Sequence, residues 1–336
     1  MLIYRMKNIL VTGGAGYIGS HIVELLVKRK NKVFIVDNLS TGYKQLINKK
    51  AKFYKLDILE TKKLNNIIVK NKIDSVIHLA ASLSVGIGEK FPQKYFKNNV
   101  IGTQSLLNAC KFTCVRNFIF SSTGVVYKDV FYNVSEKSII KPKSVYGKTK
   151  IKAENKIILS CKKNKINYGI LRYFNVAGAS PTGKIGLINR GDHLFKNLSL
   201  EILKKKTTFK IYGKDYKTHD GTTIRDYVHV SDLAEIHINV LNKISRINKS
   251  VILNCGYGKG ISVMEVVKEF KKQSKNKIKI LIKDRRPGDM VKIVARNTKL
   301  LKFIKWGPKY NKLNFLVKNC LKWEKKLAKF RYFKTI

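Results

Sequence analysis

The stretch "VTGGAGYIGSH", residues 11–21, decides the fold of this protein. It follows the apolar run "NILVT" at 8–12 and leads into the helical pattern "SHIVELLVKRK" at 20–30, so it predicts a strand, a tight turn and a helix. Three glycines, Gly13, Gly16 and Gly19, stand three residues apart in the turn. Such glycines allow the turn and let a pyrophosphate approach backbone N–H groups at the positive end of the helix dipole. The stretch therefore predicts a dinucleotide-binding turn, and the alternative is a glycine-rich turn without a ligand.

An acidic residue, Asp37, ends the second predicted strand 18 positions after Gly19. A carboxylate at this place accepts hydrogen bonds from both ribose hydroxyls and repels a 2′-phosphate. The sequence therefore favours NAD over NADP as the dinucleotide.

Short apolar runs alternate with helical patterns through the first half of the chain. The predicted strands lie at 8–12, 32–37, 52–58, 75–80, 117–122 and 168–174. They are apolar throughout, as expected of parallel strands that helices cover on both faces. We predict an α/β protein with a Rossmann-type, doubly wound parallel sheet in residues 1–175. A smaller C-terminal α/β domain for the substrate is expected at 176–336, with residues 231–250 returning to the first domain.

Later elements are predicted as a helix at 192–206, strands at 208–212 and 225–229, and a helix at 231–244.

The net charge is +48, which first suggests a nucleic-acid or anionic membrane partner. However, only 11 of the 69 basic residues are Arg, and the lysines are spread from Lys7 to Lys334. Recognition of bases and phosphates favours the planar guanidinium, so we interpret the lysines as solvated surface. We expect no specific nucleic-acid partner.

Five cysteines (Cys110, Cys114, Cys161, Cys255 and Cys320) form no CxxC pair, and we expect buried free thiols and no metal site. Free thiols fit a reducing cytoplasm. The first residues show no signal peptide, and no stretch reaches the roughly 18 apolar residues of a membrane span. A cytoplasmic protein without a membrane partner is expected.

The segment "SVYGKTK", residues 144–150, holds Tyr146 and Lys150 four positions apart. On a helix both side chains project from one face. An ammonium group beside a phenol lowers the pKa of the phenol from about 10, and a phenolate is a competent general base. The alternative is that Lys150 is one more lysine on a solvated helix, and the glycine turn upstream favours chemistry.

Over nearly its whole length the chain resembles the UDP-glucose 4-epimerases (UDP-galactose 4-epimerases) of the extended short-chain dehydrogenase/reductase family. The resemblance rests on the order and spacing of "VTGGAGYIGSH", "VDNLSTG", "DSVIHLAA", "NNVIGT", "FIFSSTGVVY", "SVYGKTK", "LRYFNVAGA", "DGTTIRDYVHVSDLA", "NCGYGKGISV" and "RRPGDMVKIVA". It implies interconversion of UDP-glucose and UDP-galactose, in which bound NAD oxidises C4 and the 4-keto sugar rotates and is reduced again.

The resemblance also implies roles for individual residues. Tyr146, Lys150 and Thr123 would be catalytic, with Tyr146 taking the 4-hydroxyl proton. The residues expected at the cofactor are Gly13, Gly16, Tyr17, Ile18, Gly19, Asp37, Asn38, Asp57, Ile58, Leu79, Ala80, Ala81, Asn98, Tyr146, Lys150 and Phe174. Those expected at the UDP-sugar are Thr123, Asn175, His193, Leu194, Tyr212, Arg225, Arg286 and Asp289. Family members are commonly homodimers, so a homodimer is expected.

Several departures from the family pattern bear on the reaction. Gly124 and Val125 stand where related dehydratases carry an acid, so the ketone is not diverted to elimination. The loop at 183–196 lacks the family's Ile-Pro after the His-Leu pair. Ile293 occupies a position that influences access of N-acetylated sugars, and a branched apolar side chain there favours glucose and galactose. The alternatives are an epimerase for UDP-N-acetylglucosamine or a UDP-pentose, and a non-catalytic protein that binds nucleic acid through its basic surface.

Overall fold

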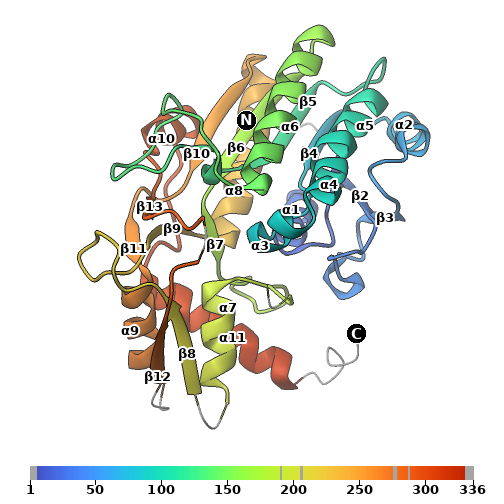
Figure 1. Ribbon diagram of the computed structural model, residues 1–336. Coiled ribbons are helices and arrows are strands. Elements are labelled where there is room, and N and C mark those ends of the chain that lie inside the picture. Colours follow the sequence, from blue (N-terminus) through green and yellow to red (C-terminus); the bar gives the residue numbers. More distant parts are fainter. Residues whose placement is uncertain (1–5, 190, 205–206, 275–277, 287, 330–336) are drawn as a thin grey trace.

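A seven-stranded parallel sheet forms the centre of the larger part of the molecule (Figure 1). The computed structural model describes residues 6–189, 191–204, 207–274, 278–286 and 288–329. The strand order is β10-β6-β5-β4-β1-β2-β3. Its strands are β1 (Asn8–Thr12), β2 (Lys32–Asp37), β3 (Lys52–Lys55), β4 (Ser75–His78), β5 (Asn117–Thr123), β6 (Asn167–Tyr173) and β10 (Val251–Cys255). The predicted doubly wound α/β fold is confirmed.

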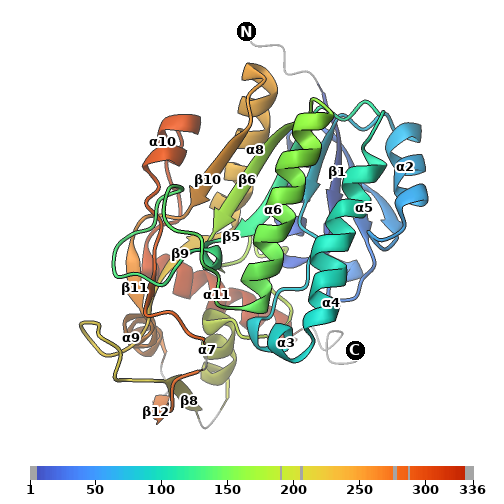
Figure 2. The same cartoon turned by 45° about the horizontal axis from the view of Figure 1, so that its top comes forward.

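The apolar strands are buried on both faces because helices cover the sheet on each side. In β1, Ile9 and Val11 face one apolar cluster, and Leu10 faces the other. Helices α1 (Tyr17–Lys28) and α8 (Val230–Ile247) complete the first cluster, while α2 (Thr61–Lys70), α5 (Gly102–Ala109) and α6 (Val145–Lys163) complete the second. Figure 2 shows α5 and α6 side by side across one face. Carboxyl ends of the parallel strands therefore meet at one edge of the sheet.

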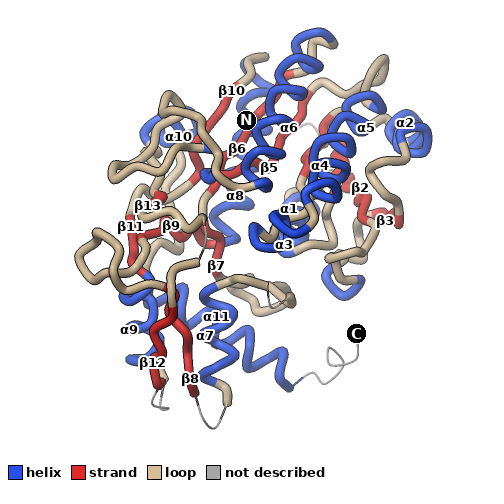
Figure 3. Tube along the Cα trace, viewed as in Figure 1, coloured by secondary structure: helices blue, strands red, loops and turns tan. Residues whose placement is uncertain are grey.

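The smaller part is built from short strands and three helices (Figure 3). Strand β9 (Ile224–His229) pairs with β7 (Asn175–Ala177), β11 (Gly260–Ser262) and β13 (Lys292–Ile293), and β8 (Thr207–Tyr212) pairs with β12 (Ile278–Lys283). Helices α7 (Leu194–Ile202), α9 (Val263–Gln273) and α11 (Leu313–Lys329) enclose an apolar core that contains Leu198, Phe270 and Leu316. Helix α10 (Thr298–Ile304) packs back against α8 and β10.

The chain returns to the large sheet further than predicted. Strand β10 pairs with β6 along residues 251–255, beyond the range 231–250 expected to return. The predicted strand at 52–58 ends at Lys55, because the Asp57 side chain accepts a hydrogen bond from the Leu59 N–H and starts a turn. The predicted helix at 192–206 is α7, and its residues 205–206 lie outside the described residues. The division into two domains stays a prediction.

Four cysteines are buried free thiols, as expected, but Cys114 is exposed. None of the described helices combines the length and the apolar character needed to cross a membrane. Within the described ranges, no group of three or more His, Cys, Asp or Glu side chains is placed to hold a metal ion.

Candidate active site

The glycine turn joins β1 to α1 at the carboxyl edge of the sheet. Gly13 adopts φ of +73°, and a Cβ added there would lie 2.7 Å from the backbone nitrogen of Ala80. A Cβ on Gly19 would lie 2.1 Å from the Gly13 carbonyl oxygen, so the helix approaches the turn closely only because this residue is glycine. Gly16 precedes the helix and adds no side chain over its N-terminus, where Tyr17 and Ile18 are the first two residues. This bare cradle fits a dinucleotide pyrophosphate.

Asp37 ends β2 with its carboxylate fixed by the backbone. The Ala15 N–H donates to Asp37 Oδ2 at 3.0 Å, and the Leu39 N–H donates to Oδ1 at 2.9 Å. Burial raises the pKa of Asp37, and these two hydrogen bonds act in the opposite direction. An oriented carboxylate beside the glycine turn is the arrangement that accepts ribose hydroxyls, so the residues fit NAD.

The other residues expected at the cofactor lie along the same edge. Asn38 donates to Asp57 at 2.8 Å, and Ile58 is buried against Gly102. Leu79, Ala80 and Ala81 directly follow β4, and Phe174 directly follows β6. Asn98 lies in a π-helical turn, η2 (Lys97–Ile101), between α4 (Pro92–Phe96) and α5, and donates to the Ser82 hydroxyl at 3.1 Å.

Tyr146 and Thr123 meet above the end of β5. The Thr123 side chain lies near enough to the Tyr146 phenol to act on its pKa, and Lys150 Nζ lies 5.8 Å from the centroid of the Tyr146 ring. Lys150 is 1% exposed and donates to the Ser121 carbonyl at 2.8 Å. The alternative that Lys150 belongs to a solvated helix face does not fit this burial.

The expected lowering of the Tyr146 pKa by Lys150 is wrong. Loss of hydration raises the pKa of the Tyr146 phenol above its usual value, nearby Tyr173 adds to the rise, and the Thr123 hydrogen bond lowers it in part. Burial also lowers the pKa of Lys150 to about 7, with Glu154 acting in the opposite direction. The physical reason is that the lysine directs its ammonium to a backbone carbonyl, while both groups lose water.

The sequence analysis did not identify Glu154, a residue of α6 that helps to hold the end of β5 next to Tyr146 and Lys150. Glu154 is 1% exposed and accepts hydrogen bonds from Arg172 Nε at 3.0 Å and Nη2 at 2.5 Å, and from the Ser122 hydroxyl. Glu154 thereby holds Ser122, the residue before Thr123, against α6. A signal was present, because Tyr146, Lys150 and Glu154 repeat every four residues on one helix face.

The residues expected at the diphosphate and uridine form two contacts in the smaller part. Arg225 Nη2 lies 3.3 Å from Asp289 Oδ1, and the Arg286 guanidinium stacks 4.1 Å from the centroid of the Tyr212 ring. Arg225 is largely buried, whereas Arg286 is exposed. Two guanidinium groups are suited to a diphosphate, which accepts bidentate hydrogen bonds. Pro287, between Arg286 and Asp289, lies outside the described residues.

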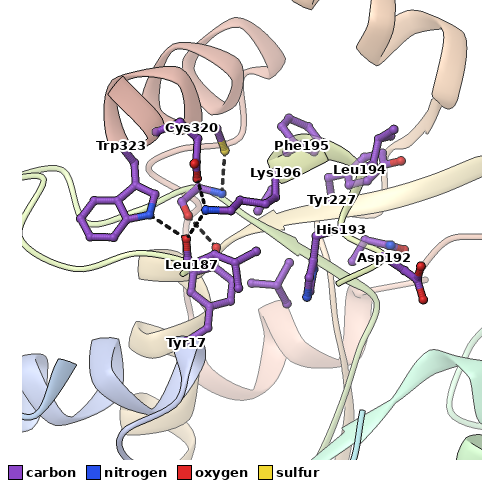
Figure 4. A pocket seen from close by; sticks show the side chains of 15 residues that line it. Tyr17, Leu187, Asp192, His193, Leu194, Phe195, Lys196, Tyr227, Cys320 and Trp323 are labelled. Carbon is purple, nitrogen blue, oxygen red and sulfur yellow. Dashed lines mark hydrogen bonds and ion pairs between the residues drawn. The ribbon is translucent and has the colours of Figure 1, made fainter. Parts of the chain in front are cut away.

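Asn175, His193 and Leu194 line a small cavity of about 50 Å³ beside β7, α7 and α11 (Figure 4). Tyr17 reaches the same cavity from α1, and its hydroxyl donates to the Gly178 carbonyl at 2.6 Å. His193 stands at the N-terminus of α7 and is exposed. The structure therefore joins three predicted substrate residues to one predicted cofactor residue, and Arg225 and Arg286 are not among the residues that line this cavity.

The fold and this site define a dinucleotide-binding enzyme of the Tyr-x-x-x-Lys type. A profile described as the NAD dependent epimerase/dehydratase family matches residues 9–256, and the chain belongs to this family.

Individual relatives agree with this assignment. A UDP-glucose 4-epimerase from Lactobacillus helveticus is 39% identical over 320 residues, which cover 95% of this chain and 97% of the relative. A solved UDP-glucose 4-epimerase is 36% identical with a TM-score of 0.91, covering 96% of this chain and 98% of that one. Another, from Bifidobacterium longum in complex with NAD⁺ and UDP, is 31% identical with a TM-score of 0.89, covering 96% of this chain and 99% of that one. The resemblance seen in the sequence motifs is confirmed.

Proposed function

We propose that this protein interconverts UDP-glucose and UDP-galactose, with NAD as its bound cofactor. The observation that carries the proposal is the contact of Tyr146 with Thr123 at the carboxyl end of β5, with the buried Lys150 beside it. A phenol and a hydroxyl placed together at the dinucleotide edge can both bind a sugar hydroxyl, and the ionised form of the phenol can accept its proton. The supporting similarity extends over nearly the whole chain.

Bound NAD supplies a reversible hydride acceptor for C4 of the hexose. Tyr146 takes the proton of the 4-hydroxyl in its phenolate form, which the positive charge of an oxidised nicotinamide beside it would favour once NAD is bound, and Thr123 holds the same oxygen by its hydroxyl group. In the second half of the reaction Tyr146 returns the proton to the reduced oxygen, so the protein ends the cycle in its starting protonation state. Arg225 and Arg286 hold the diphosphate, which leaves the 4-keto sugar free to turn its other face.

The residues after Thr123 favour epimerisation over dehydration. The chain continues into a 3₁₀ turn, η3 (Gly124–Val126), whose first residue is packed against Phe174. Neither Gly124 nor Val125 can protonate a leaving hydroxyl group. The 4-keto sugar is therefore reduced again, rather than losing the 6-hydroxyl.

We propose that glucose and galactose are preferred over N-acetylated hexoses. Ile293 lies in β13, in register with Arg225, and is 4% exposed in an apolar cluster with Tyr127 and Met290. We infer that its branched side chain limits the room beside Arg225 for an N-acetyl group. Rates with UDP-N-acetylglucosamine that equal those with UDP-glucose would contradict this preference.

The activity test is to mix purified protein with UDP-galactose and follow UDP-glucose by NMR. Tyr146→Phe is expected to lower kcat by at least about 100-fold, because it removes the proton-transfer group, while NAD binding is retained. Tyr132→Phe, at an exposed tyrosine, is the matched control and should behave like wild type. Wild-type turnover in Tyr146→Phe would remove Tyr146 as the base, and no conversion by wild type would refute the function.

We also propose a cytoplasmic homodimer without a dedicated nucleic-acid partner. Large apolar side chains, Ile87, Phe91, Phe96 and Ile101, are exposed from α3 (Val85–Lys90) through η2, next to α6. Such a patch is typical of an interface between copies. The dispersed lysines support a general solvated surface. RNA affinity that stays tight at about 0.2 M salt would contradict the absence of a nucleic-acid partner.

A further inference from the structure

Residues 186–189, here called the bridging segment, are fixed at one end by two helices of the smaller part (Figure 4). The Leu187 carbonyl accepts a hydrogen bond from Trp323 Nε1 at 2.8 Å and another from Lys196 Nζ at 3.1 Å. A Cβ on Gly186 would lie 2.6 Å from the Trp323 ring, so the backbone of the segment packs directly on the indole. Lys196 comes from α7 and Trp323 from α11.

The other end of the bridging segment reaches the loop after β2. The Asn189 side chain donates to the Thr41 carbonyl at 3.0 Å and accepts a hydrogen bond from the Tyr43 hydroxyl. Asn189 is thus bonded at both ends of the turn at 41–43. These contacts join residues about 150 positions apart in the sequence.

The turn at 41–43 lies against the groups that would bind the cofactor ribose. A Cβ on Gly42 would lie 2.9 Å from Asp37 Oδ1, and the Tyr43 N–H donates to the Ala15 carbonyl at 3.0 Å. Asp37 itself accepts from the Ala15 N–H. A displacement of this turn would therefore move the carboxylate and the glycine turn together.

A buried ion pair holds the near end of the bridging segment. Lys196 Nζ lies 2.6 Å from Glu324 Oε1, and the two side chains are 4% and 3% exposed. Two buried charges lose hydration, so such a pair is weak evidence of a purely stabilising role, and apolar residues of similar volume often replace it without loss. The hydrogen bond from Lys196 to the Leu187 carbonyl gives this lysine a second role, which an apolar residue would not fulfil.

We propose that Lys196 and Glu324 are positioning residues, which fix the bridging segment so that Asn189 holds the turn at 41–43, and with it Asp37, in the arrangement that binds the adenosine ribose of NAD. This inference rests on the proposed function, since it concerns the same cofactor. Both side chains line the cavity that Asn175, His193 and Leu194 also line, and the proposed effect on NAD passes through the bridging segment. Its loss should speed the release of NAD and leave the binding of UDP unchanged.

The test measures the rate of NAD release from purified protein and the affinity for UDP by calorimetry. Asn189→Ala cuts the far end of the bridging segment without disturbing the buried pair. The double variant K196M/E324M removes the pair and keeps comparable side-chain volume. We expect each variant to release NAD about 10-fold faster with UDP affinity unchanged, and the combined triple variant to be no faster than either, because all three changes break one connection.

The matched control is the double variant K204M/E201M, which removes a partly exposed ion pair at the end of α7. It should release NAD at the wild-type rate, and faster release would show that any loosening of α7 suffices, which would overturn the proposal. Unchanged release from Asn189→Ala would also overturn it, whether or not K196M/E324M folds. A wild-type protein that holds NAD but does not convert UDP-galactose would refute the proposed function alone.

Discussion

Asp37 shows how one residue can carry both the binding and the choice of a cofactor. Its two carboxylate oxygens are each fixed by a backbone N–H, from Ala15 and Leu39. The negative charge thus stays at one place beside the glycine turn. A fixed carboxylate accepts the ribose diol and repels a 2′-phosphate, so both properties depend on the same oxygens.

Replacing Asp37 by Asn tests this dual role. We expect NAD affinity to fall by at least about 10-fold and discrimination against NADP to narrow, since the amide has no charge and one of its atoms would face a backbone N–H. Calorimetric titration with NAD and NADP measures both effects. Asp74→Asn is the control, because Asp74 accepts a backbone N–H at the opposite, amino end of β4. Unchanged discrimination in Asp37→Asn would contradict the assignment of NAD specificity to this residue.

The proposed contact between two copies of the chain is formed by helices α4 and α6. Phe96 ends α4 and is 39% exposed, and Lys152 Nζ of α6 lies 5.1 Å from the centroid of its ring. In a two-fold interface each change occurs twice, because both copies use the same patch. One charged substitution on this patch therefore places two charges, one from each copy, in the dimer interface, where they lose hydration.

Phe96→Lys is expected to weaken dimerisation by at least about 100-fold, because two ammonium groups would lose hydration without partners. Light scattering coupled to size-exclusion chromatography, run over a range of concentrations, gives the association state. Phe112→Lys is matched in chemistry and lies beyond the end of α5, where Phe112 is fully exposed, so it should leave the dimer intact. A monomeric wild type, or a dimer that persists in Phe96→Lys, would exclude this interface.

The sequence predicted the bounds of individual strands better than their pairing partners or the burial of the side chains near them. The runs at 8–12 and 32–37 match β1 and β2, because buried parallel strands are apolar on both faces and glycine or polar residues end them. Local patterns could not predict β10 as a seventh strand, since its pairing with β6 joins segments about 80 residues apart. The protonation behaviour of Tyr146 and Lys150 was also beyond spacing alone, because it depends on burial that only packing determines.

Four buried histidines make the free energy of unfolding of the whole molecule depend on pH. His21, His78, His229 and His237 are at most 5% exposed, and burial lowers the pKa of the first two to about 3 and of the last two to about 4. In the unfolded chain these groups titrate near 6.5. Between pH 6.5 and 4 the unfolded state therefore binds more protons than the native state, and the free energy of unfolding falls as pH falls. Asp226, whose pKa burial raises to about 6, offsets roughly one of these protons.

The expected result is an acid-labile protein, with the free energy of unfolding falling by about 4 kcal/mol per pH unit between pH 6 and 5. Urea denaturation at closely spaced pH values measures this slope. His237→Leu should reduce the slope by about 1.4 kcal/mol per pH unit, because it removes one proton from the difference between the states. His237 suits this change, since it packs on Tyr173 and its Nε2 has no hydrogen-bond partner among the described residues. A flat profile in wild type, or equal slopes in wild type and His237→Leu, would mean that the buried histidines do not set acid stability.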